Sequence, residues 1–271
     1  MRNYSITTFL AAIMKKAATI VLVVGLLTIT FLEFRHYQEL RKQYPGDKTH
    51  AEDLLLVSVP RGERRKVELP DGTVAWLNAS SILTYPRNME AGERNVEVTG
   101  EAFFQVATIA SRPFRVRARD MLVEVLGTSF NLRNYPEETF TRAIVSEGTI
   151  RVTHNEEQVL LRPGEEADVE SCKIEGPALT MHSGVDADAA SGWTRGFLEF
   201  NNTDLPTLLH ELSRAYNVDI QLEGVITSNT FYGSFSLKEP LEEVIQRLDF
   251  HNLHASVRRR GEGKVILTIK P

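Results

Sequence analysis

The sequence predicts a mainly β protein with a single N-terminal transmembrane helix, a layered all-β domain and a small α+β domain at the C-terminus. Three observations carry this prediction. An uncharged apolar run lies near the N-terminus. Between residues 62 and 170, short runs of alternating Val, Leu, Phe and Thr recur at roughly eight- to twelve-residue intervals, separated by turn sequences. After residue 195, strand-like runs alternate with two runs at helical spacing.

Composition and charge exclude several classes of protein. Of the 271 residues, 42% are apolar and 25% are charged, which is typical of globular proteins with real cores. The formal net charge of −5 argues against a nucleic-acid binder, because neutralising phosphates requires a basic face. We interpret the basic run at residues 258–260 as a solvated strand end. The single cysteine, Cys172, excludes an internal disulfide framework and a cysteine-based zinc site.

The apolar run at residues 17–32 carries no charge. It is shorter than the roughly 20 residues that cross a bilayer comfortably, so the expected span extends to residue 34. Three interpretations compete: a cleaved signal peptide, a buried core helix and an uncleaved anchor. Bulky and charged residues after the run disfavour cleavage, and the absence of a polar face disfavours a core helix. We therefore expect a transmembrane helix over residues 17–34.

The charges beside this run predict its orientation. Lys15 and Lys16 precede it directly, which favours an N-terminus inside the cell. Residues 1–16 then form a short cytoplasmic tail, and Met14 resembles a natural translation start. Residues 35–59 are predicted to be a polar, partly helical stalk that breaks at Pro45-Gly46-Asp47.

An all-β domain is predicted over residues 60–170. The pair Asp71-Gly72 predicts a tight hairpin, because glycine supplies the positive φ that such a turn requires. The apolar residues around this turn are expected to face a shared interior; they are Val67, Leu69, Val74, Trp76 and Leu77.

One phrase occurs twice in this domain, as VEVTGEAFFQV at residues 96–106 and VEVLGTSFNLR at residues 123–133. Because side chains alternate along a strand, the valines share one face while Glu97 and Glu124 point outward. Gly100 and Gly127 are expected to mark a bend or bulge. Aromatic packing of Phe103, Phe104 and Phe130 would then close the corner. Stacking of the two copies would bury a continuous apolar strip, so packing alone explains the repeat.

The remaining chain predicts an α+β domain over residues 195–271, in the order β-α-β-β-α-β-β, with both helices on one face of the sheet. Residues 202–204 are suited to cap the first helix and Pro240 to begin the second. The strands are expected at FLEF, VDIQL, TFYGSFSL, ASVRRR and KVILTIK. Residues 171–194 are small and polar and are predicted to be a linker.

Catalytic, cofactor and metal sites do not assemble from the sequence, so we predict no enzyme. Serines lack a nucleophile-elbow context, and no phosphate-binding glycine loop is present. Acidic pairs at 137–138, 156–157 and 242–243 are interpreted as solvated surface. His251 and His254 have a spacing that could bind a metal, but no third ligand lies nearby, which favours a capping or surface role. Four aromatic residues are interpreted as core anchors, with a sugar-binding platform as the alternative; they are Trp76, Trp193, Phe197 and Phe200.

An ordered series of phrases resembles the FecR family, the membrane-bound sigma-factor regulators of Gram-negative bacteria. The series covers residues 60–169 and consists of GERRKVELPDGTVAWLNASSILTYP, RNVEVTGEAFFQVA, RPFRV, VEVLGTSFNLRNY, VSEGTIRV and LRPGEEA. The resemblance implies a single-pass inner-membrane protein with the bulk of its chain in the periplasm. Its β domain would sense an outer-membrane TonB-dependent transporter and pass the signal to an extracytoplasmic-function sigma factor.

The C-terminal segment resembles the domain that follows FecR in many such regulators, which is similar to the short N-terminal domain of secretins and TonB-dependent receptors. Two domains of related design could pair sheet edge to sheet edge. The partner would be the periplasmic signalling domain of the transporter. The candidate partner interface is the strand residues Phe231, Tyr232, Gly233, Ser234 and Phe235.

The sequence departs from the family pattern before the membrane. Typical members carry a cytoplasmic helical segment of several dozen residues that grips the sigma factor, and here only residues 1–16 precede the apolar run. Three explanations stay open: a mis-assigned start, a split or truncated gene, or a different signalling route. Two other functions also stay open, an envelope module that binds glycans or cell wall and a hydrolase at the membrane surface.

Overall fold

The structure is a computed structural model that describes residues 53–89, 93–170, 178–223, 230–247, 254–259 and 264–270. Residues 53–271 form one compact unit. The predicted cytoplasmic tail, transmembrane helix and most of the predicted stalk lie outside the described residues, as does Cys172. Within the described ranges, no helix combines the length and the apolar character that crossing a bilayer requires.

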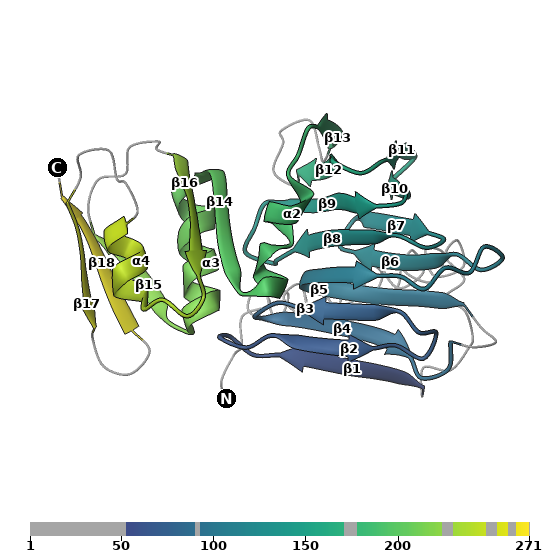
Figure 1. Cartoon of the computed structure of the whole chain (residues 1–271), viewed down its shortest axis with the longest axis horizontal. Helices are drawn as coiled ribbons and strands as arrows, with labels where there is room; N and C mark the ends of the chain where they lie inside the picture. The colour runs from purple at the N-terminus through teal and green to yellow at the C-terminus, as the bar shows by residue number, and fades with distance from the viewer. Residues whose placement is uncertain are drawn as a thin grey trace, which may run out of the picture. The chain divides into compact units, whose positions relative to one another are not determined.

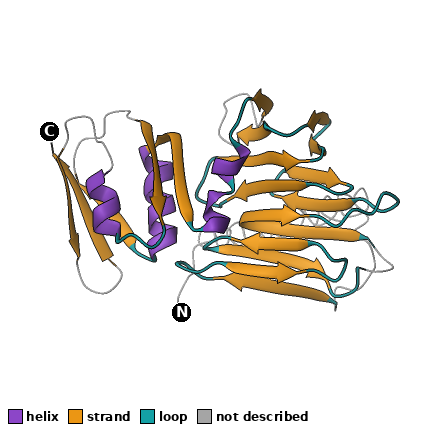
Figure 2. Cartoon of the chain, viewed as in Figure 1, coloured by secondary structure: helices purple, strands orange, loops and turns teal. Residues whose placement is uncertain are grey.

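We define the β lobe as residues 53–183; its described residues form a network of thirteen hydrogen-bonded strands (Figures 1 and 2). Its path runs β11-β10-β7-β6-β5-β8-β9-β12-β13, and β1 to β4 join this path beside β5. The bounds are β1 Leu54–Val59, β2 Arg65–Glu68, β3 Val74–Leu77, β4 Ser81–Pro86, β5 Arg94–Gln105, β6 Phe114–Ala118, β7 Met121–Val125, β8 Ser129–Asn134, β9 Phe140–Glu147, β10 Ile150–His154, β11 Glu157–Leu161, β12 Glu165–Glu170 and β13 Ala178–Ser183.

Strand β5 belongs to two layers at once. Its first half pairs with β4 and β6, and its second half pairs with β3 and β8. The change of partners falls at Gly100, whose φ of +99° is open to glycine. A Cβ there would lie 2.5 Å from Ser81 Oγ. The predicted bend at Gly100 is therefore confirmed, and it is what allows one strand to serve both layers.

The apolar residues of the repeated phrase pack in the core, as predicted. Its five valines are buried, and Phe104 stacks on Phe130 with ring centroids 5.3 Å apart. These two phenylalanines are cross-strand partners in the β5–β8 pair. The second glycine of the repeat, Gly127, lies against Thr108, and the β8–β9 register shifts between Ser129 and Phe130. Close backbone approach and a bulge thus accompany the second copy as well.

The hairpin at Asp71-Gly72 forms, but the interior predicted beside it needs a correction. Gly72 has φ +83°, and the turn closes through the Leu69 N–H donating to the Thr73 carbonyl at 2.8 Å. Alternation along β3 turns Ala75 and Leu77 inward, whereas Val74 and Trp76 face the other side. Trp76 packs there against Phe103, with ring centroids 5.7 Å apart. Neighbouring residues of one strand cannot share a face, which is why Trp76 and Leu77 separate.

The predicted linker contains regular structure. Strand β13 pairs antiparallel with β12, and it is followed by the short helix α2, Ala187–Ala190, and the 3₁₀ helix η1, Gly192–Arg195. The Asp186 carboxylate caps α2 by accepting hydrogen bonds from the backbone N–H groups of Asp188 and Ala189. The small polar residues of this segment are typical of a linker. They nevertheless form a strand and helical turns here, because backbone pairing and capping need no apolar side chains.

The C-terminal lobe, residues 197–270, has the predicted element order. The bounds are β14 Phe197–Asp204, α3 Leu205–Tyr216, β15 Asp219–Glu223, β16 Thr230–Ser236, α4 Leu241–Arg247, β17 His254–Arg259 and β18 Lys264–Lys270. The Asp204 carboxylate caps α3, as the residues before that helix predicted. The buried apolar side chains of α3 and α4 pack into one core with Phe200, Phe231 and Phe235.

The single sheet predicted for this lobe is wrong. The strands form two sheets, β14-β16 and β15-β18-β17, and α3 contacts strands of both (Figure 1). Strand β16 pairs antiparallel with β14, while β15 pairs in parallel with β18. The order of elements along the sequence does not determine which strands pair, because a strand-length run of residues does not indicate its partner strand.

Candidate functional site

The predicted partner-interface residues alternate between core and solvent on β16. Phe231 and Phe235 are each 3% exposed and belong to the core of the C-terminal lobe, so their side chains are packing residues. Tyr232 is 64% exposed and donates its hydroxyl to Asn202 Oδ1 at 2.9 Å, and Ser234 is exposed. Gly233 is half-buried between them. Within the described ranges β14 is the one strand that pairs with β16, which leaves its other edge without a strand partner.

A second candidate site was not predicted from the sequence: a polar joint between the β lobe and α3. We define the joint by the loop at residues 60–64 and by Glu101, Arg133, Tyr135, Glu137, Glu138, Glu211 and Arg214. Its members come from β5, from β8 and the turn that follows it, and from α3. The joint therefore connects segments that lie far apart in the sequence.

The loop at residues 60–64 holds the C-terminal end of α3. The Gly62 N–H donates to the Arg214 carbonyl at 2.8 Å. Arg61 donates to the Ser213 carbonyl at 3.0 Å and to the Val218 carbonyl, and its Nη1 lies 2.6 Å from Asp219 Oδ1. The last carbonyls of a helix lack intrahelical partners, and a cation near them is favourable. Arg61 supplies both the donors and the charge.

Glu138 is the centre of the joint. Its side chain is 2% exposed, and Oε1 lies 2.8 Å from Arg133 and 2.9 Å from Arg214. One arginine comes from the β lobe and the other from α3, so a single buried carboxylate joins the two. Burial acts to raise the pKa of Glu138, but the two guanidinium groups outweigh it and hold the pKa below its usual value. The charged form of Glu138 is thus the stable one here.

The ring of Tyr135 packs against the guanidinium group of Arg214. The guanidinium carbon of Arg214 lies 3.6 Å from the centre of the tyrosine ring, a cation–π contact. The ring is 1% exposed, and its hydroxyl donates to the Ala79 carbonyl at 2.9 Å. Burial raises the pKa of Tyr135, so the phenol stays neutral and keeps its proton for that hydrogen bond.

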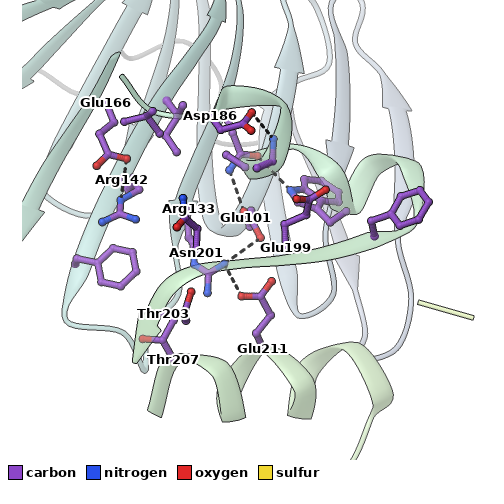
Figure 3. Close-up of a pocket in the computed structure, with 18 of the residues that line it drawn as sticks. Glu101, Arg133, Arg142, Glu166, Asp186, Glu199, Asn201, Thr203, Thr207 and Glu211 are labelled. Atoms are coloured by element: carbon purple, nitrogen blue, oxygen red, sulfur yellow. Dashed lines mark hydrogen bonds and ion pairs between the residues drawn. The ribbon is translucent and has the colours of Figure 1, made fainter. Parts of the chain in front are cut away.

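Glu101 is fully enclosed beside the joint. Its carboxylate accepts from Asn78 Nδ2 at 2.8 Å and from Asn131 Nδ2 at 2.9 Å, and it lies 3.7 Å from Arg133 Nη1. Burial raises the pKa of Glu101, although Arg133 opposes the shift. Figure 3 shows Glu101 and Glu211 both approaching the same end of Arg133, at Nη1. Arg133 thus has three carboxylates within ion-pair distance: Glu101, Glu138 and Glu211.

A cleft of 390 Å³ opens beside the joint and is lined by both lobes and by α2. Its carboxylates outnumber its two guanidinium groups, and they belong to Glu101, Glu166, Asp186, Glu199 and Glu211 (Figure 3). The described residues that line it include no histidine, cysteine or serine. This set of side chains is suited to charged contacts and to hydrogen bonding.

One cluster in this region has the ligand types of a metal site. Atoms of Glu166, Asp168 and His182 lie within 4.8 Å of one another. Arg142, however, donates from Nε and Nη2 to the two oxygens of Asp168 at 2.6 and 2.8 Å, and its Nε lies 3.5 Å from Glu166. The guanidinium therefore occupies the place a cation would take. Of the sequence-based histidine pair, neither side chain lies in the part of the chain that the structure describes.

Two other interpretations from the sequence need correction. Glu138 belongs to an acidic pair taken as solvated surface, yet it is the buried centre of the joint, while Glu137 is 38% exposed. Phe197 was expected to anchor the core but is 43% exposed, whereas Trp193 and Phe200 are buried. Trp193 donates its indole N–H to Asn131 Oδ1 at 3.3 Å and is 4% exposed, and it is also one of the residues that line the cleft.

Comparison with known proteins identifies the chain. The profile of the FecR protein family matches residues 56–151, and that of the FecR C-terminal region matches residues 197–266. A crystal structure from Parabacteroides distasonis ATCC 8503, assigned as a candidate anti-sigma factor, is 33% identical with a TM-score of 0.72. The alignment covers 80% of this chain and 100% of that one. The chain belongs to the FecR family.

A second crystal structure, of the same description and organism, is 34% identical with a TM-score of 0.72 and the same coverage. No curated protein matches the chain. The joint links the two regions that define the FecR family here. Arg61, Arg133 and Glu138 lie in the first matched region, and Glu211 and Arg214 lie in the second.

Proposed function

We propose that this FecR-family protein is an anti-sigma-type regulator. It relays the state of an outer-membrane TonB-dependent transporter to an extracytoplasmic-function sigma factor through protein–protein contact, with no reaction of its own. The observation that carries the proposal is the pairing of the two FecR regions through a buried polar joint. The related structure, assigned as a candidate anti-sigma factor, supports it along its whole length.

The proposed location is the inner membrane. The uncharged run at residues 17–32 supports a single span, and residues 53–271 would then lie in the periplasm, where a transporter's signalling domain is accessible. In this arrangement the folded unit supplies the receiving end of the relay, and the sigma factor is its cytoplasmic end.

The proposed receiving surface is the open edge of β16. A strand from the partner would add to this edge through main-chain hydrogen bonds, and the outward side chains would set the preference for the partner. Tyr232 and Ser234 point outward from this strand. The buried Phe231 and Phe235 fix the strand to the lobe beneath. Binding of a protein at this edge would therefore act directly on the core that contains α3.

Binding of residues 53–271 to the transporter's periplasmic signalling domain tests the proposal, with a soluble cell-wall polysaccharide as the second ligand. We expect the signalling domain to bind and Tyr232→Glu to weaken it at least tenfold. Met181→Glu is the matched control, because Met181 is 48% exposed on another edge strand, β13, and should leave binding unchanged. Binding of polysaccharide alone, untouched by Tyr232→Glu, would favour the glycan-binding alternative.

A further inference from the structure

Arg64 is half-buried, and two of its donor atoms lack a hydrogen-bond partner among the described residues. Its Nε and Nη2 atoms are buried and have no hydrogen-bond partner among the described residues. These are the same two atoms with which Arg142 grips both oxygens of Asp168. An arginine presents this pair of donors to a carboxylate in a bidentate fork, and leaving buried charged donors unpaired is costly. Arg64 is therefore arranged for a carboxylate that it does not hold here.

The neighbours of Arg64 place it in the joint. Burial lowers the pKa of its guanidinium, and Tyr135, Glu101 and Glu211 act electrostatically against that shift. Arg64 also ends the loop that holds α3 through Arg61 and Gly62. The two unpaired donor atoms are closed off from solvent, so an outside ligand cannot reach them in this arrangement. The partner that Arg64 lacks must come from the joint itself.

The charges of the joint are shared unevenly. Arg133 has three carboxylates within ion-pair distance, while Arg64 has none among the described residues. Carboxylates gathered on one guanidinium repel each other, and an unpaired guanidinium nearby offers relief. Glu211 is the carboxylate best placed to move, because it is on α3, the element that belongs to the other lobe. It lies one turn before Arg214 on that helix, so a shift of α3 moves both contacts together.

We propose that the joint is a latch with two positions. In the position seen here Glu211 pairs with Arg133 at 3.1 Å and Arg64 is unpaired. In the second position α3 shifts against the β lobe, Glu211 pairs with Arg64, and Arg133 keeps Glu101 and Glu138. The unpaired charge lowers the stability of the first position and so reduces the free energy needed to leave it.

The latch gives the proposed relay a moving part, and this last step rests on the proposed function. Leu208 and Leu212 of α3 pack in one core with Phe231 and Phe235 of β16. A partner that adds a strand to β16 displaces this core, and α3 is carried with it. Binding at the edge would therefore favour the second position by its difference in affinity for the two.

The first experiment removes the unpaired charge. Arg64→Met keeps the aliphatic stem and deletes the guanidinium, so we expect the thermal midpoint of residues 53–271 to rise by about 2–4 °C. Arg142→Met is the matched control, because it removes an arginine whose fork is occupied by Asp168, and it should lower the midpoint. A midpoint that falls for Arg64→Met as it does for Arg142→Met overturns the latch.

The second experiment measures the distance between the lobes. Spin labels at Glu97→Cys and Lys238→Cys, both exposed, report it in a Cys172→Ser background. We expect two distances in the free protein, only the first in Arg64→Met, and more of the second in Arg133→Met. Glu156→Gln, at an exposed residue outside the joint, is the control with no change expected.

A single distance shared by all these variants overturns the latch. Adding the transporter's signalling domain should raise the share of the second distance. Because the two distances are measured first without a partner, absence of binding would count against the proposed function and leave the result on the latch standing.

Discussion

Glu138 and Arg214 lie 2.9 Å apart although 76 residues separate them in the sequence, and both side chains are nearly free of solvent. A buried carboxylate between two arginines stabilises an interface only while all its members are present. Removing one member leaves the others desolvated and unpaired. The joint is thus a place where single substitutions should have large effects on how the two FecR regions hold together.

Glu138→Gln should weaken the joint strongly. The amide keeps the shape of the side chain but removes the charge that compensates Arg133 and Arg214, so the free energy of unfolding should fall by about 3 kcal/mol. Glu137→Gln should cost about 1 kcal/mol or less, because Glu137 is 38% exposed and its ion pair is screened. Urea denaturation of residues 53–271 measures both. Equal losses for the two variants would contradict a joint centred on Glu138.

The same residue predicts a pH dependence. The pKa of Glu138 is lower in the folded state than in the unfolded chain, so its stabilising contribution is present above the unfolded pKa and is lost as pH falls through the folded pKa. An ordinary glutamate has a pKa of 4.5. The stability of the wild type should decline as the pH is lowered below this value. Glu138→Gln should show a smaller decline. Denaturation curves at a series of pH values test this, and parallel profiles would argue against it.

Glu101 should behave with the opposite sign. Burial raises its pKa above that of the unfolded chain, so its contribution is complete below the unfolded pKa and is lost as pH rises through the folded pKa. Relative to Glu101→Gln, the wild type should therefore lose stability as the pH rises from the acid side. The difference between the two denaturation profiles isolates Glu101. A difference that stays constant with pH would show that its pKa is not shifted.

The bend in β5 predicts a backbone effect. Gly100→Ala places a Cβ 2.5 Å from Ser81 Oγ at φ +99°, so the free energy of unfolding should fall by about 3 kcal/mol, at the top of the range for a strained residue. Gly184→Ala is the matched control, because Gly184 has φ +79° and nothing within 4 Å of the added atom. It should cost about 1 kcal/mol. The difference between the two variants measures the steric contact alone.

Gly100 also shows which features of the fold could be predicted from the sequence. The repeat of valine, glycine and phenylalanine predicted both the bend and the stack of Phe104 on Phe130, because alternation and glycine geometry are local properties. The element order of the C-terminal lobe followed from helical and strand spacing in the same way. Strand partnership was not local, which is why one sheet was expected where β14-β16 and β15-β18-β17 form two.

The joint could not be predicted from the sequence for a related reason. Glu138 follows Glu137 in a turn-like stretch, and an acidic pair there is usually solvated. Its burial depends on Arg133 five residues earlier and on Arg214 far along the chain. No pattern links those positions. The family resemblance covers a segment on each side of the contact but does not say how the two segments meet, so it did not reveal the contact either.

The first strand supplies the last prediction. Strand β1 reads LLLVSV, with no charge or proline, and β4 is the one strand that pairs with it within the described ranges. Leu54 and Leu56 are 55% and 65% exposed on its outer face. An apolar edge strand without charged residues favours self-association. Leu56→Lys should therefore lower the aggregation of residues 53–271 on concentration, while stability stays within about 0.5 kcal/mol because the site is exposed. Light scattering measures the first and urea denaturation the second. Glu68→Lys, a charge change on β2, which pairs with β3 and not with β1, should leave aggregation as it is in the wild type.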